Sequence, residues 1–166
     1  MPLSLLAQTK FAHYNYAEIL PNMKEYATAQ AELETMKKQF EDDLKLMQDE
    51  LQKKYADYEK EAANLLDNIR ARREQELMEL QQRLQQSVQD NELAFQKATQ
   101  EKLALINEKV MAAVKKIGEA GGYVYIVDTS IGAISFINPA MSTDVTSQLK
   151  KELGITASVA VPAENK

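Results

Sequence analysis

The fold is decided by a stretch that begins Asn22-Met23-Lys24-Glu25-Tyr26 and ends Val114-Lys115-Lys116-Ile117. Its 96 residues contain no glycine and no proline, whereas the rest of the 166-residue chain holds five glycines and four prolines. Inside a helix, glycine costs about 1 kcal/mol and proline about 3 kcal/mol relative to alanine. A run of this length without either residue predicts helix.

Apolar side chains recur through this stretch at helical spacing. From Leu33 to Ile69, eleven of them cover 36 residues in ten steps of 3.6 on average, which is the repeat of a straight helix. A second series runs from Leu77 to Ile117 and thins between Gln85 and Lys102. We expect residues 85–102 to be the loosest part of the helical region.

The length of the helical stretch favours two helices over one. A single helix would extend for roughly 140 Å at 1.5 Å per residue, whereas two antiparallel helices can bury their apolar stripes on each other. We expect a helical hairpin over 22–117 that turns near residue 70, where Asp67 and Asn68 can bond backbone groups. Three basic residues suit its exposed tip: Arg70, Arg72 and Arg73. The alternative is that residues 68–75 are only a solvated face of a helix.

The two ends of the chain predict a small sheet. A candidate strand covers 10–14, followed by a short apolar turn at 17–20. Beyond the expected helix caps Gly118, Gly121 and Gly122, two β-branched and aromatic runs at 123–127 and 133–137 predict strands. Thr143 and Asp144 then precede a predicted short helix, 145–153, which Gly154 stops. The fold class is α+β, mainly α, with a β-rich body formed by both chain ends.

This body is too small to stand alone. Residues 8–21 and 118–155 supply 52 residues, below the roughly 70–80 at which a single core reliably suffices, and the chain has no cysteine for a disulfide. Oligomerisation is the expected remedy. Six apolar side chains are candidates for the core of the body and for its oligomer interface: Phe11, Tyr123, Tyr125, Val127, Ile134 and Phe136.

The terminal segments lie outside these domains. Residues 1–7 resemble the end of a signal peptide cleaved after Ala7, although the basic leading region is missing. The alternative is an ordinary disordered or strand-leading chain end. Residues 156–166 predict a disordered tail. No apolar run approaches the roughly 18 residues of a membrane span.

Several apolar residues lie off the main stripe, where the packing of one helix on another does not need them. As exposed, adaptable side chains they are candidates for binding an unfolded client chain. The alternative is that they widen the helix seam or sit singly in solvent, which is common. These candidates are Leu46, Leu66, Met78, Leu93 and Leu105.

The residues give little support for an enzyme. One histidine and no cysteine leave the common zinc sites and Cys/His nucleophiles without their residues, and His13 is interpreted as a strand residue. The glycines follow a helix instead of opening one, so they do not indicate a phosphate cradle. The acidic run 41–43 is interpreted as a solvated helix face. With 20 basic against 25 acidic residues, nucleic acid is not expected as a partner, and neither is a cofactor or metal.

The order of these segments resembles that of the Skp/OmpH-like periplasmic chaperones. The resemblance is carried by 11–14, 18–26 and 29–33, and by Gly122-Tyr123-Val124-Tyr125-Ile126-Val127-Asp128 at the far end, and it covers roughly residues 9–155. It implies a periplasmic homotrimer with a β-rich body and three helical arms that enclose a cavity. It further implies that unfolded outer-membrane proteins are bound there without ATP and kept from aggregating.

The chain departs from that family in its charge. The best-known enterobacterial member is strongly basic, whereas the helical stretch 22–117 carries 16 basic against 19 acidic residues. No motif allows a lipopolysaccharide site to be assigned. Two other functions stay open: a prefoldin-like cytosolic chaperone, in which the strands would lie between the helices, and a structural coiled-coil tether, which would not need a sheet.

Overall fold

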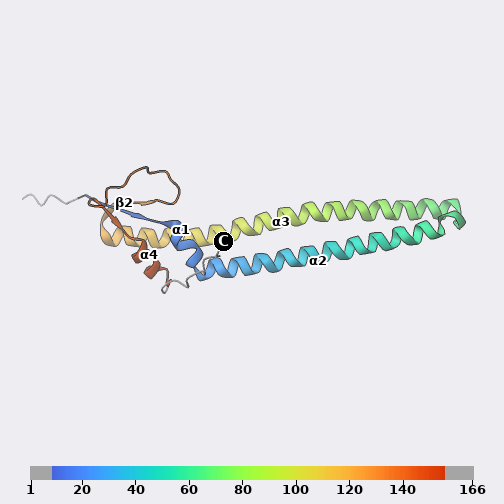
Figure 1. Ribbon diagram of the computed structural model, residues 1–166, viewed down its shortest axis with the longest axis horizontal. Coiled ribbons are helices and arrows are strands. Elements are labelled where there is room, and N and C mark those ends of the chain that lie inside the picture. Colours follow the sequence, from blue (N-terminus) through green and yellow to red (C-terminus); the bar gives the residue numbers. More distant parts are fainter. Residues whose placement is uncertain (1–8, 156–166) are drawn as a thin grey trace, which may run out of the picture. The chain divides into compact units, whose positions relative to one another are not determined.

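The computed structural model describes residues 9–155, and two long helices dominate it (Figure 1). Helix α2 spans Lys24–Glu61 and helix α3 spans Asp67–Gly121. The chain divides into two compact units. We call residues 30–101 the helical unit, and residues 9–29 together with 102–155 the sheet unit.

Within the helical unit, α2 and α3 lie side by side and run in opposite directions (Figure 1). Most of the predicted stripe of α2 is half-buried, including Leu44, Met47 and Leu51, while Tyr55 is exposed. On α3, Leu80 is buried. Two helices can cover only one side of each stripe, so the apolar seam between them stays partly open to solvent.

The break between the two helices comes earlier than the sequence predicts. A 3-10 helix, η2, covers Ala62–Asn64, and Leu65 follows with an extended backbone. Asp67 and Asn68, expected to interrupt a helix, are instead the first residues of α3. The turn expected near residue 70 is therefore wrong by several residues. The Arg70 guanidinium stabilises the turn at this earlier position, because it donates hydrogen bonds to the carbonyls of Ala62 (3.1 Å) and Leu65 (3.2 Å) at the end of η2.

Helix α3 ends at the paired glycines. Gly122 follows the helix with φ of 62°, the left-handed conformation that a residue with a side chain rarely adopts. At Gly121 a side chain would clash, because an added Cβ would lie 2.3 Å from the ring of Tyr123. Gly118, expected as a cap, lies inside α3 and caps nothing. The residue pair 121–122 alone produces the turn from helix to strand.

The sheet joins both ends of the chain, as the sequence predicts. Strand β1, Lys10–Tyr14, lies at the centre and pairs in parallel with β2, Tyr123–Asp128, on one side and with β3, Ser142–Asp144, on the other. Long stretches of chain that contain other elements separate β1 from both β2 and β3, as parallel pairing requires. The strand expected at 133–137 is not formed. Residues 129–141 contain no helix or strand, and β3 supplies the third strand instead.

Short helices complete the sheet unit. Asn15 caps α1, Tyr16–Ile19, by accepting a 3.1 Å hydrogen bond from the Ala17 amide, and the 3-10 helix η1, Leu20–Asn22, leads into α2. Helix α4, Thr146–Glu152, lies close to the expected 145–153, and Gly154 follows it with φ of 70°.

The core of the sheet unit is built between the sheet, the short helices and the ends of the long helices. Its most deeply buried large side chains are Ile19, Met23, Val110, Val145 and Leu149. On α3, the buried positions continue with Ile106, Ala113 and Ile117, at helical spacing. Truncating a side chain such as Leu149 to alanine would cost about 2–5 kcal/mol. Residues that the sequence assigns to the helical hairpin thus contribute to the core of the sheet unit.

Of the six side chains expected in the body core, Tyr123 packs against the core and the other five lie outside it. Phe11, Tyr123 and Val127 are half-buried, whereas Tyr125, Ile134 and Phe136 are exposed. The reason is the alternation of side chains along a strand: in β1, Ala12 and Tyr14 face the core, so Phe11 faces the other way. There its ring meets that of Tyr125, with centroids 4.9 Å apart. Their expected role at an interface between copies stays a prediction.

Two predictions concern residues outside the part that the structure describes. These are the signal-peptide remnant at 1–7 and the disordered tail at 156–166.

Candidate functional site

The five off-stripe side chains proposed from the sequence are all exposed. Leu66 is 73% exposed and Leu46 is 68% exposed, and the other three lie between 64% and 67%. Four of them belong to the helical unit, and Leu105 belongs to the sheet unit. Their exposure indicates that they contribute little to the packing of the two helices. Met78 nevertheless lines the groove between α2 and α3, so the alternative that these side chains widen the helix seam stays open, and their binding of a client stays a prediction.

A groove of about 710 Å³ runs between α2 and α3 in the helical unit. Five of its lining residues have large apolar or aromatic side chains: Leu51, Tyr55, Tyr58, Leu77 and Met78. The others are the glutamines 48, 52 and 81, and Glu74. Tyr55 and Met78 are more than half exposed, so the groove offers its apolar wall to solvent.

Tyr58 and Glu74 connect the two helices across this groove. The Tyr58 hydroxyl donates a hydrogen bond to a carboxylate oxygen of Glu74. This hydrogen bond raises the pKa of Tyr58, because losing the proton would place two negative charges side by side. Sequence reasoning placed Tyr55 and Tyr58 in the helix seam and missed the groove. The available signal was the pair of tyrosines in a stripe whose other members are mostly aliphatic.

The three arginines expected at the tip differ in their contacts. Arg70 is held by backbone carbonyls of the turn and by a 3.4 Å ion pair with Asp67. Arg72 and Arg73 both lie near Glu76, at 3.9 and 4.0 Å. Arg70 thus organises the turn, whereas the other two form exposed pairs of the kind that contribute little to stability.

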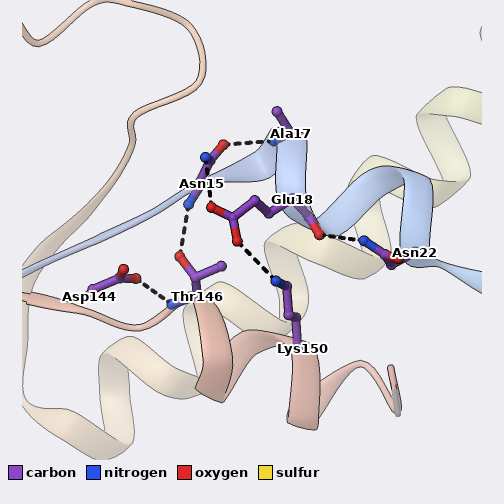
Figure 2. A network of polar contacts seen from close by, with 7 residues as sticks. All are labelled: Asn15, Ala17, Glu18, Asn22, Asp144, Thr146 and Lys150. Atoms are coloured by element: carbon purple, nitrogen blue, oxygen red, sulfur yellow. Dashed lines mark hydrogen bonds and ion pairs between the residues drawn. The ribbon is translucent and has the colours of Figure 1, made fainter. Parts of the chain in front are cut away.

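A polar network in the sheet unit joins the start of α1 to α4 (Figure 2). The backbone amide of Asn15 donates a hydrogen bond to the hydroxyl of Thr146 (3.1 Å), and the Lys150 ammonium group pairs with the Glu18 carboxylate (3.0 Å). The Thr146 amide donates to Asp144 at 2.8 Å. A side-chain hydrogen bond from Thr146 is the main cause that lowers the pKa of Asp144. The network is structural, because each of these groups is satisfied by a neighbouring element.

His13 lies on the central strand and contacts a serine of the neighbouring strand. Its Nδ1 is 2.8 Å from the hydroxyl oxygen of Ser142. The strand register places Cα of His13 opposite Cα of Asp144. Asp144, however, is engaged by the start of α4, and the contact with Ser142 is made through a single ring nitrogen. This arrangement indicates a sheet contact and no catalytic triad.

Residues 9–155 offer neither a cluster of metal ligands nor a membrane-spanning helix. No group of three or more His, Cys, Asp or Glu side chains among residues 9–155 is placed to hold a metal ion. None of the helices in the same range is long and apolar enough to cross a membrane.

Comparisons with known proteins agree with the fold. The model of the family described as outer membrane protein (OmpH-like) matches residues 10–153. The crystal structure of a Caulobacter crescentus CB15 protein, described as an outer membrane chaperone (OmpH-like), superposes with a TM-score of 0.74. The two sequences are 15% identical, and the superposition covers 89% of this chain and 85% of the Caulobacter chain. The likeness is therefore one of fold. No curated protein matches.

The family match covers most of the chain, including both long helices and the three strands β1, β2 and β3. It confirms, at the level of the family, the resemblance that the sequence suggests. The chain belongs to the OmpH-like family.

Proposed function

We propose that this chain is a holdase chaperone that works without ATP, binds unfolded outer-membrane proteins in the periplasm and prevents their aggregation. The observation that carries the proposal is the set of exposed apolar side chains on the helical unit, Leu46, Leu66, Met78 and Leu93, which the fold does not use. Scattered apolar contacts suit a client with no fixed structure, because each contact is weak and many can act together. Membership of the OmpH-like family supports the same function.

The proposal includes an assembly of three copies. In it, the sheet unit holds the copies together and the hairpin of α2 and α3 is the arm that contacts the client. Support comes from the exposed apolar side chains of the sheet unit, among them Tyr125, Ile131 and Phe136, which a partner copy would cover. Support comes also from the small number of residues in the predicted body.

Dilution of a client tests the function directly. An outer-membrane β-barrel protein unfolded in urea is diluted into buffer with and without the purified chain, in the absence of ATP, and light scattering is followed. We expect scattering to fall as the chain is added in increasing ratio. Scattering that is the same with this chain as with an equal mass of serum albumin would contradict the holdase function.

A triple variant tests which side chains hold the client. Replacing Leu46, Met78 and Leu93 with serine should weaken the suppression of aggregation in a graded way, because avidity falls as contacts are removed. Helix content by circular dichroism should stay nearly intact, since these side chains are exposed. The matched control replaces the exposed residues Val88 and Met111 with serine. Equal suppression by the triple variant and the wild type would show that the three side chains are bystanders.

A further inference from the structure

The negative charge of the chain is concentrated in one unit. The helical unit, residues 30–101, carries 17 acidic against 11 basic residues, a net charge of −6, whereas the rest of the chain carries 8 acidic against 9 basic residues. The acidic character of the protein thus belongs to the unit that offers exposed apolar side chains. Charge of one sign beside a binding surface raises the local concentration of ligands of the opposite sign.

The segments around the groove between α2 and α3 also carry more acidic than basic residues. The segments that line it, 48–58 and 74–81, contain six acidic residues and two lysines. Glu74 is the one charged residue that lines the groove itself. No lysine or arginine does so.

Ion pairs offset only part of this negative charge. Lys45 pairs with Asp49 at 3.0 Å, Lys54 lies 3.7 Å from Glu50, and two arginines lie near Glu76. Asp57, Glu74 and Glu79 form no ion pair within residues 9–155, although Tyr58 bonds Glu74 and Gln75 bonds Glu79. These three carboxylates have no cationic partner among the described residues, and Glu74 lines the groove itself.

We propose that this groove binds segments of unfolded polypeptide in which large apolar or aromatic side chains stand next to lysine or arginine. The inference rests on the proposed function and names which parts of a client chain the helical unit prefers. The apolar side chain lies against Tyr55, Leu77 and Met78, and the cationic group lies toward Glu74. An acidic segment is disfavoured, because its carboxylates meet the unpaired carboxylates around the groove.

Two fluorescent peptides of equal length and equal apolar content test the preference. One carries three lysines beside its leucine and phenylalanine residues, and the other carries three glutamates at the same positions. By fluorescence anisotropy with the full chain, we expect the lysine peptide to bind about tenfold more tightly at low ionic strength. The difference should shrink in about 0.5 M salt, where charges are screened over a few ångströms. Equal binding of the two peptides at low salt would overturn the inference.

Variants assign the binding to this groove. Tyr55→Ser with Met78→Ser removes the exposed part of the apolar wall and should weaken binding of the lysine peptide about tenfold or more. The control Val88→Ser with Met111→Ser removes exposed apolar side chains outside the groove and should leave binding unchanged. Glu74→Gln keeps an acceptor for the Tyr58 hydroxyl but loses the charge, so it should reduce the preference for lysine about threefold. Unchanged binding by the groove variant would place the site elsewhere.

Three outcomes separate this inference from its alternatives. If the groove variant changes the mass of the assembly, a second copy of the chain occupies the groove, and the inference is overturned. If the wild type suppresses aggregation but shows no preference between the peptides, the inference fails while the holdase function stands. If the wild type does not suppress aggregation at all, the proposed function itself fails.

Discussion

Single polar side chains complete the helix ends of this protein. At the turn between the long helices, the Arg70 guanidinium donates to the carbonyls of Ala62 and Leu65. At the start of α4, Asp144 accepts from the Thr146 amide. In both places one side chain forms hydrogen bonds with backbone groups at the end of a helix. Each can be tested by a substitution.

Replacing Arg70 with alanine should loosen the turn. The variant removes the side-chain donor from the carbonyls of Ala62 and Leu65, of which Ala62 keeps the Leu65 amide as a donor, and we expect a loss of about 1 kcal/mol in local stability. Hydrogen exchange should be faster for amides at 62–70 and unchanged in the sheet unit. Arg72→Ala is the matched control, because Arg72 makes only an exposed contact with Glu76. Equal exchange in the two variants would mean that Arg70 does not organise the turn.

Replacing Asp144 with alanine should destabilise the protein in a way that depends on pH. The loss at neutral pH should be about 1 kcal/mol, as for other capping residues. Because the folded state lowers the pKa of Asp144, its contribution is present above the ordinary value of 3.8 and is lost as the pH falls through the lower folded value. Urea unfolding at pH 7 and at pH 3 measures this. A difference between wild type and variant that is as large at pH 3 would contradict the assignment.

The elements of the protein differ in how firmly they are packed. Along α3, Leu80 and Ile106 are buried, and no side chain between them is. From Ile106 to Ile117 four buried side chains follow one another at helical spacing. Segments with few buried apolar contacts open locally at lower free energy than the rest of a domain.

Hydrogen exchange should therefore divide α3 into two parts. Amides at 85–102 are expected to exchange faster than those at 106–117, because opening the first segment exposes little apolar surface. The comparison is internal to one helix, so solvent and temperature are the same for both segments. Equal protection of the two would show that partners absent from a single chain cover the first segment.

At the scale of the whole molecule, apolar surface is left open in both units. In the helical unit it includes the groove and the off-stripe side chains, which the proposed function assigns to a client. In the sheet unit it includes Val124, Tyr125, Ile131, Phe136 and Met141. An exposed apolar surface of this kind, on β2 and the loop that follows it, is typical of an interface.

Sedimentation equilibrium tests the assembly that we propose. A closed trimer should give about three times the mass of one chain, without dependence on concentration in the micromolar range. Replacing Phe136, which is 78% exposed, with serine should weaken the assembly without unfolding the single chain, because Phe136 is not part of its core. A wild-type monomer at micromolar concentration would contradict the proposal.

Strong local signals explain how much of the fold could be predicted. The absence of glycine and proline over 22–117 predicts helix, and the segment at 10–14 and the β-branched and aromatic run at 123–127 predict the two strands that the structure has. The run at 133–137 has the same composition but forms no strand in the single chain. β-propensity describes a residue that fits a half-buried sheet surface, and no such surface is offered to this run.

The candidate site was predicted only in part, for a similar reason. The exposure of Leu46, Leu66, Met78, Leu93 and Leu105 follows from their place off the helical stripe, which a sequence shows. The groove at Tyr55 and Tyr58 cannot be read from the helical stripe, because the groove depends on how α2 faces α3. The core of the sheet unit was misplaced by the same lack of long-range information.

The sequence by itself thus determined the two long helices, the sheet built from both chain ends and the family to which the chain belongs, since each depends on composition and spacing along the chain. Only the tertiary structure decided where the helices are interrupted, which strand completes the sheet and which side chains form the core. The turn depends on a guanidinium that reaches back to carbonyls five and eight residues earlier in the chain. The core depends on Ile106, Val110 and Ile117 meeting Ile19 and Leu149 from distant parts of the chain. Such contacts are set by packing in space, which local propensity does not encode.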